Sequence, residues 1–179
     1  MSNASTYGPA FFEGRSETVA RSAQIVVPVL VDLFDPESVL DVGCGKGEWL
    51  HAFDLEDTGG VDIAAPEKWR FVPHDLTKPL NLARYFDLVI SLETGEHLPE
   101  DAAPTLVQTI AWHARSRVVF SAAVPGQGGV GHINCQPHEY WHDLFFCYGF
   151  EPQDLIRPRI SRDPNVSPWY RENIWAYVR

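Results

Sequence analysis

The sequence predicts an α/β fold: a doubly wound, mostly parallel sheet of about seven strands with helices on both faces. Two observations support this prediction. Short, nearly all-apolar runs alternate with segments of helical periodicity, as expected for strands that helices bury on both sides. A glycine-rich turn, Gly43 to Gly47, follows the first of these runs, and open α/β sheets bind ligands at such positions.

The expected strands are residues 38–43, 60–63, 70–73, 86–92, 117–122, 150–156 and 173–178. The expected helices are residues 16–34, 102–114 and 137–147. Pro28 lies inside the first helix and is expected to kink or split it. The connection from Asp62 to Phe71 is too short for a complete crossover helix, so we expect the sheet to be trimmed at this edge.

The length of 179 residues indicates a single domain, residues 1–179. Within it, residues 1–37 are expected to form an N-terminal helical segment. Residues 157–168 are rich in proline and polar residues and are expected to be a structureless insertion. Such a loop serves either as a lid over a binding site or as a solvated excursion, and the sequence leaves both open.

Charge and composition limit the range of partners. The formal net charge of −10 argues against nucleic acid, because nucleic-acid binding depends on basic surfaces that neutralise phosphates. The longest apolar run, Ile25 to Leu30, is far shorter than the roughly 20 residues of a membrane span. The three cysteines do not form a disulfide framework, and no secretion signal is seen at the N-terminus. We therefore expect a cytoplasmic protein without nucleic-acid or membrane partners.

Three ligand classes compete for the glycine-rich turn. A dinucleotide site requires G-x-G-x-x-G, but Gly47 comes one position too early and Glu48 occupies the position of the third glycine. A phosphate-binding loop requires G-x-x-x-x-G-K-[ST], which the segment from Gly43 to Lys46 does not fit. The third pattern, D-x-G-x-G-x-G, matches from Asp41 to Gly47.

This last pattern resembles the class I S-adenosylmethionine-dependent methyltransferases, which have a Rossmann-like fold. The resemblance implies that the turn passes under the methionine part of S-adenosylmethionine. An acid after the second strand would bind the ribose, an acid after the third would face the adenine, and a glutamate after the fourth would lie beside the methyl donor. The cofactor-binding residues implied in this way are Asp41, Gly43, Cys44, Gly45, Gly47, Asp62, Asp75 and Glu93.

The later segments 120–134 and 136–141 resemble a subgroup of small bacterial and phage methyltransferases, in which a glutamate is common at the position of Cys135. The chain lacks the [DN]-P-P-[YFW] signature of amino-methylating DNA enzymes and the Pro-Cys pair of cytosine C5 enzymes. A small-molecule acceptor, such as a sugar or a natural-product intermediate, is therefore the best prediction. The methylated atom would be oxygen or nitrogen.

The acceptor needs a group that takes its proton, and histidine titrates near neutral pH. His97 and His132 are the predicted catalytic bases, because they follow the fourth and fifth strands and thus face the cofactor turn. The loop 126–136, with four glycines, is expected to wrap the acceptor. The predicted acceptor-binding residues are Glu96, Asn134 and Gln136.

A competing motif is His138-Glu139-Tyr140-Trp141-His142, which matches the zinc-protease signature H-E-x-x-H. Pro137 places His138 in the first helical turn, and the downstream helix offers no third ligand, so we predict no metal there. Three functions remain open: a methyltransferase, an S-adenosylmethionine-binding protein with another sulfonium chemistry or no activity, and a zinc hydrolase.

Overall fold

A computed structural model describes residues 9–64 and 70–179 of the chain. Its centre is a seven-stranded sheet of order β3-β2-β1-β4-β5-β7-β6. All neighbouring strands are parallel except β7, which is antiparallel to both β5 and β6. The strands are β1 Ser38–Val42, β2 Asp57–Asp62, β3 Phe71–Pro73, β4 Leu88–Leu92, β5 Arg117–Ser121, β6 Glu151–Gln153 and β7 Trp175–Val178.

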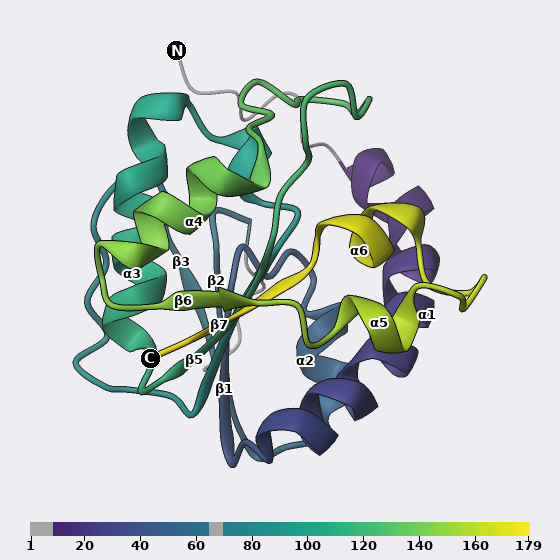
Figure 1. Cartoon of the computed structure of the whole chain (residues 1–179), viewed down its shortest axis with the longest axis horizontal. Coiled ribbons are helices and arrows are strands. Elements are labelled where there is room, and N and C mark those ends of the chain that lie inside the picture. The colour runs from purple at the N-terminus through teal and green to yellow at the C-terminus, as the bar shows by residue number, and fades with distance from the viewer. Residues whose placement is uncertain (1–8, 65–69) are drawn as a thin grey trace.

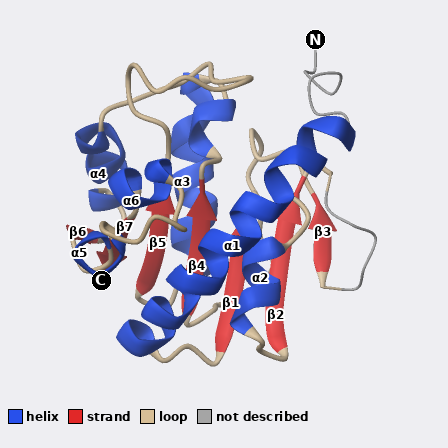
Figure 2. Cartoon of the chain, turned by 90° about the vertical axis from the view of Figure 1, so that its right-hand side faces the viewer, coloured by secondary structure: helices blue, strands red, loops and turns tan. Residues whose placement is uncertain are grey.

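Helices cover both faces of the sheet (Figure 1), with α3 and α4 on one side and α1, α2, α5 and α6 on the other. Each layer buries its own apolar core against the sheet, and the face under α1 and α2 is seen in Figure 2. The helices are α1 Pro9–Phe34, α2 Glu48–Phe53, α3 Ala103–His113, α4 His138–Phe146, α5 Arg157–Ile160 and α6 Pro168–Asn173. Two short 3₁₀ turns, η1 Gly95–His97 and η2 Glu100–Ala102, follow β4.

The predicted fold class is confirmed. The sheet is mostly parallel, has seven strands and carries helices on both faces. The β3 edge consists of three residues, and the connection leading to it contains residues 65–69, which lie outside the described residues. No helix in the described part of the chain is long and apolar enough to cross a membrane.

Two local expectations need correction. Pro28 does not split α1, which runs unbroken from Pro9 to Phe34 with Pro28 on its exposed side, and a kink at Pro28 stays a prediction. Residues 157–168 are not structureless: α5 opens the segment, and Ile160 and Val166 are buried. Prolines suggested a loop here, but Pro158 and Pro168 lie in the first turns of α5 and α6, where a missing N–H costs no helical hydrogen bond.

Candidate active site

The turn after β1 has glycine at three of its five positions, 43, 45 and 47, so a ligand can approach its backbone closely there. Gly43, Gly45 and Gly47 have φ angles of 88°, 53° and 85°, the left-handed region that favours glycine. A Cβ on Gly43 would overlap the side chain of Thr94, which follows β4, and a Cβ on Gly47 would lie 2.8 Å from Cζ of Phe71. The turn is therefore packed against Thr94, which follows β4, and against Phe71 of β3.

Asp41 is the acid that precedes this turn, and it is almost completely buried in β1. Its Oδ2 atom has no hydrogen-bond partner. Burial, together with the negative charges of Asp62 and Glu48, raises the pKa of the Asp41 carboxyl well above its usual range. A buried acceptor atom without a partner beside a glycine-rich turn fits the amino group of the methionine part of S-adenosylmethionine.

Asp62 ends β2 and braces the turn from the side. Its two carboxylate oxygens accept hydrogen bonds from the backbone N–H of Gly45 (3.0 Å) and of Ala64 (2.9 Å). Each oxygen keeps a second lone pair, so the carboxylate still has the acceptors that two ribose hydroxyls require. The geometry thus agrees with the predicted role and adds a structural one.

Cys44 and Asp75 have local functions in the structure. The Cys44 thiol is buried, and burial with the nearby charge of Asp41 raises its pKa, which makes it unreactive. Asp75, just beyond β3, accepts hydrogen bonds from the backbone N–H (3.0 Å) and the hydroxyl (2.7 Å) of Thr77. These bonds lower the Asp75 pKa and form a turn, and a role toward the adenine stays a prediction.

Glu93 follows β4 in a strained conformation, with φ 53°. Its N–H donates to the carbonyl of Ser121 at the end of β5. Its carboxylate accepts hydrogen bonds from Nε2 of Gln127 (3.1 Å) and Nδ2 of Asn173 (3.5 Å), and burial raises its pKa. Strain that is held by long-range hydrogen bonds is typical of functional positions.

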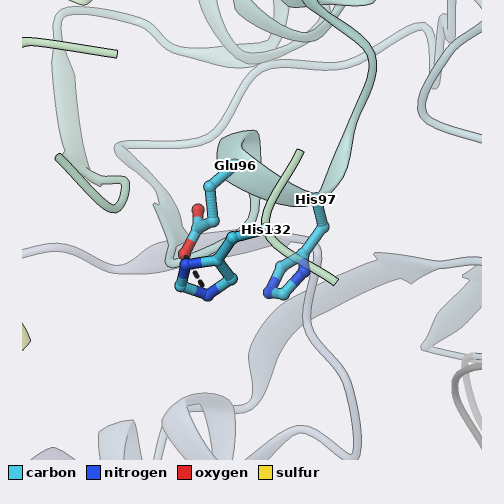
Figure 3. Close-up of side chains that lie close together, drawn as sticks. All are labelled: Glu96, His97 and His132. Carbon is cyan, nitrogen blue, oxygen red and sulfur yellow. Dashed lines mark ion pairs between the residues drawn. The ribbon is translucent and has the colours of Figure 1, made fainter. Parts of the chain in front are cut away.

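The next turn of chain brings three predicted site residues together (Figure 3). Nε2 of His132 lies 3.9 Å from Oε1 of Glu96, and the rings of His97 and His132 are in edge-to-face contact with centroids 4.9 Å apart. Glu96 is fully buried, and neither of its carboxylate oxygens makes a well-formed hydrogen bond, although the carboxyl of Glu93 and the backbone N–H of Ala123 lie nearby. Burial and the negative charge of Glu93 raise the pKa of the Glu96 carboxyl well above its ordinary value.

Backbone hydrogen bonds hold the loop after β5 over this turn. The carbonyl oxygen of Glu96 accepts from the N–H of Ile133 (2.9 Å) and of Asn134 (3.1 Å), and Nδ1 of His97 donates to the carbonyl of Gly131 (3.2 Å). The loop is therefore docked on η1, and this docking delivers His132 to Glu96. The turns after β1, β4 and β5 meet at one edge because these strands are parallel neighbours.

Asn134 and Gln136 were expected to converge with His132 on an acceptor. In the structure, Nδ2 of the buried Asn134 donates to the carbonyl of Gly95 (3.4 Å), and Nε2 of Gln136 donates to Oδ1 of Asn134 (2.9 Å). Neither side chain caps α4. These two amides hold the loop on η1, and direct contact with an acceptor stays a prediction.

Sequence reasoning missed three residues that complete the site: Thr94, Gln127 and Asn173. Thr94 packs against Gly43. Gln127 and Asn173 both donate hydrogen bonds to the carboxylate of Glu93. Nδ2 of Asn173 also donates to Oε1 of Gln127 (2.8 Å). Gln127 was detectable as the polar residue inside the glycine loop. Asn173 carried no such signal, because only the return of the chain through α6 and β7 places it at this edge.

The H-E-x-x-H motif lies elsewhere. His138 and His142 stack on α4 with ring centroids 6.4 Å apart, and both contact the ring of Trp175 in β7. Burial lowers the pKa of both imidazoles. Within residues 9–64 and 70–179, the one group of three or more side chains placed to share a metal ion is Glu96, His97 and His132.

The strand order, the glycine turn with its leading acid and the acid that ends β2 define a class I S-adenosylmethionine-dependent methyltransferase. The chain belongs to the methyltransferase domain family, whose sequence profile matches residues 15–145. S-adenosylmethionine is the cofactor of this family. No curated protein matches the sequence.

Solved structures show the same fold across the chain. DesVI from Streptomyces venezuelae is 16% identical with a TM-score of 0.69, over 99% of this chain and 98% of that one. CalS10, an amino pentose methyltransferase from Micromonospora echinaspora with bound S-adenosylmethionine, is 14% identical with a TM-score of 0.69. The match covers 100% of this chain and 99% of that one. Magnesium protoporphyrin IX methyltransferase from Synechocystis PCC 6803 is 21% identical with a TM-score of 0.62. The match covers 94% of this chain and 81% of that one.

Proposed function

We propose that this methyltransferase transfers a methyl group to an oxygen or nitrogen atom of a small molecule, a sugar or a natural-product intermediate. The observation that carries the proposal is the polar cluster of Glu96, His97 and His132 beside the cofactor turn. CalS10, which shares the fold over the whole chain, is an amino pentose methyltransferase from calicheamicin biosynthesis. The net charge of −10 disfavours nucleic acid as the acceptor, and the three free cysteines agree with a reducing, cytoplasmic location.

Residues of β1, β2 and β4 would hold the cofactor. Asp41 offers a buried oxygen without a partner to the amino group, Gly43, Gly45 and Gly47 let the cofactor approach the backbone of the turn, and Asp62 offers lone pairs to the ribose. We assign Glu93 to the same side and Asp75 to the adenine. S-adenosylmethionine supplies an activated methyl group on its sulfonium sulfur, so the protein must mainly align the acceptor and exclude water.

Glu96, His97 and His132 would activate the acceptor, and Asn134 and Gln136 would hold the loop that covers it. A hydroxyl or an ammonium group must lose a proton before its lone pair can attack. Nε2 of His132 and Oε1 of Glu96 lie 3.9 Å apart, so an acceptor bound beside them could reach either group, and either could take that proton.

The test is a screen of hydroxyl- and amino-sugars, small phenols and oligonucleotides with methyl-labelled S-adenosylmethionine, with product masses measured. We expect a mass increase of one methyl group on a small molecule and none on the oligonucleotides. Methylation of an oligonucleotide, with no methylation of any small molecule, would contradict the proposed acceptor class. Failure to bind S-adenosylmethionine in calorimetry would contradict the cofactor assignment itself.

A further inference from the structure

We propose that Glu96, His97 and His132 form a binding site for a divalent first-row transition-metal ion. One carboxylate and two imidazoles each present a ligand atom, and the three atoms lie within 4.8 Å of one another. Two ligands of one ion can be at most about 4.2 Å apart at metal–ligand bonds of about 2.1 Å. Small side-chain rotations would therefore close the cluster around an ion.

The strongest indication is the carboxylate of Glu96. The side chain is fully buried, yet neither oxygen makes a well-formed hydrogen bond, and Nε2 of His132 lies 3.9 Å from Oε1. The carboxyl of Glu93 and the backbone N–H groups of Glu96 and Ala123 lie close enough to affect its pKa. A buried carboxylate without well-formed hydrogen bonds costs stability and requires an explanation. A cation between Glu96 and the imidazoles supplies the missing partner, and the nearby carboxylate of Glu93 adds to its electrostatic attraction.

The hydrogen bond of His97 matches that of a metal ligand. Its Nδ1 lies 3.2 Å from the carbonyl oxygen of Gly131, and because a carbonyl only accepts, Nδ1 carries the proton. The lone pair of the neutral ring is then on Nε2. Histidine ligands commonly donate their other ring N–H to a backbone carbonyl, which fixes the ring and the tautomer.

His132 is held as a ligand from the loop side. Its Nδ1 is 3.8 Å from Sγ of Cys135, while Nε2 faces Glu96. Gly129 lies so close to this ring that a Cβ there would overlap it. The glycine therefore permits a close approach of the loop backbone, which keeps the imidazole over Glu96 with 8% of its side chain exposed.

The mixed donor set indicates which ions fit. Imidazole nitrogen favours Mn²⁺, Fe²⁺, Co²⁺ and Zn²⁺ over Mg²⁺ and Ca²⁺, which prefer oxygen ligands. Three protein ligands leave coordination positions open for another molecule. Resting on the proposed function, we assign one open position to the acceptor oxygen or nitrogen. The ion would lower the pKa of a bound hydroxyl, whose proton would leave to water, so that His97 and His132 act as ligands of the ion and not as direct bases.

The experiment measures Mn²⁺ and Zn²⁺ binding to the full chain by calorimetry, with electron paramagnetic resonance of bound Mn²⁺. We expect one ion per chain, with Mg²⁺ bound more weakly. Glu96→Gln and His132→Ala should each weaken Mn²⁺ binding at least roughly tenfold, while His142→Ala in the H-E-x-x-H helix should leave it unchanged. Circular dichroism and S-adenosylmethionine binding establish that each variant is folded.

Absence of Mn²⁺ and Zn²⁺ binding to a chain that binds S-adenosylmethionine would overturn the metal site and leave the proposed function intact. If His142→Ala loses metal binding while Glu96→Gln and His132→Ala retain it, the ion binds at the H-E-x-x-H helix, and this result would also overturn the assignment to Glu96, His97 and His132. If Glu96→Gln does not fold, His132→Ala decides, because His132 lies in a loop outside the sheet and helices. Unchanged Mn²⁺ affinity in folded His132→Ala contradicts the proposal.

Discussion

Trp141 of α4 packs directly against Gly95, the residue before Glu96: a Cβ on Gly95 would lie 2.6 Å from Cη2 of Trp141. Trp141 is fully buried and also contacts Phe120 of β5, with ring centroids 4.9 Å apart. The indole therefore supports the 3₁₀ turn that carries Glu96 and His97. The helix with the H-E-Y-W-H sequence contributes to the site through its tryptophan, by packing.

Gly95→Ala should destabilise the protein by about 1–3 kcal/mol, because the added methyl group overpacks a site against the fully buried Trp141. Urea denaturation monitored by tryptophan fluorescence measures the change. Gly128→Ala is the matched control, since nothing lies within 4 Å of a Cβ there, and it should be nearly neutral. Equal stability of the two variants would show that Trp141 does not constrain the turn.

Asp41→Asn should stabilise the ligand-free protein by about 1–3 kcal/mol at neutral pH, because it removes a buried charge near Asp62 and Glu48. The folded pKa of Asp41 is raised, so the folded state holds this proton more tightly than the unfolded state, and stability falls as pH rises above the unfolded pKa of about 3.9. The gain in the variant should thus be absent near pH 3 and complete above the folded pKa.

Thermal denaturation of wild type and Asp41→Asn over this pH range measures the difference. S-adenosylmethionine binding should weaken roughly tenfold in the variant, about 1.4 kcal/mol, because the amino group loses its carboxylate. A variant that is less stable than wild type at neutral pH would show that the Asp41 charge is compensated in the fold.

Asp62→Ala should weaken S-adenosylmethionine binding by roughly 1–3 kcal/mol, the value of hydrogen bonds to a charged group. Part of this loss reflects the turn, because Asp62 also accepts the N–H of Gly45. Asp57→Ala, at the start of the same strand and paired with Arg84 at the surface, serves as the control. Calorimetry that finds equal affinities for both variants would remove Asp62 from the cofactor site.

His132→Ala should lower turnover of an identified acceptor at least roughly a hundredfold, in the range of one lost acid–base or activating group. His142→Ala, a histidine outside the cluster, should retain turnover. Because S-adenosylmethionine contacts are assigned to other residues, its affinity should be the same in both variants. Full turnover in His132→Ala would make the loop a scaffold and leave His97 as the activating residue.

The sequence by itself determined the sheet, the cofactor turn and the order of its acids. These features depend on local patterns: apolar runs of strand length, glycines that adopt positive φ, and acids placed directly after strands. For the same reason it placed His97 and His132 at one sheet edge, since parallel strands that end together bring their loops together.

Only the tertiary structure decided how these loops meet. Glu96 and His132 are brought together by backbone hydrogen bonds between segments 36 or more residues apart, and Asn173 joins Glu93 across 80 residues of chain. Residues 157–168 are partly helical because Ile160 and Val166 are buried in the same apolar cluster as residues of α1. No local sequence pattern indicates this long-range contact. Long-range packing and hydrogen bonds override local propensity at these positions, and they also exclude Glu96 from solvent beside the carboxyl of Glu93.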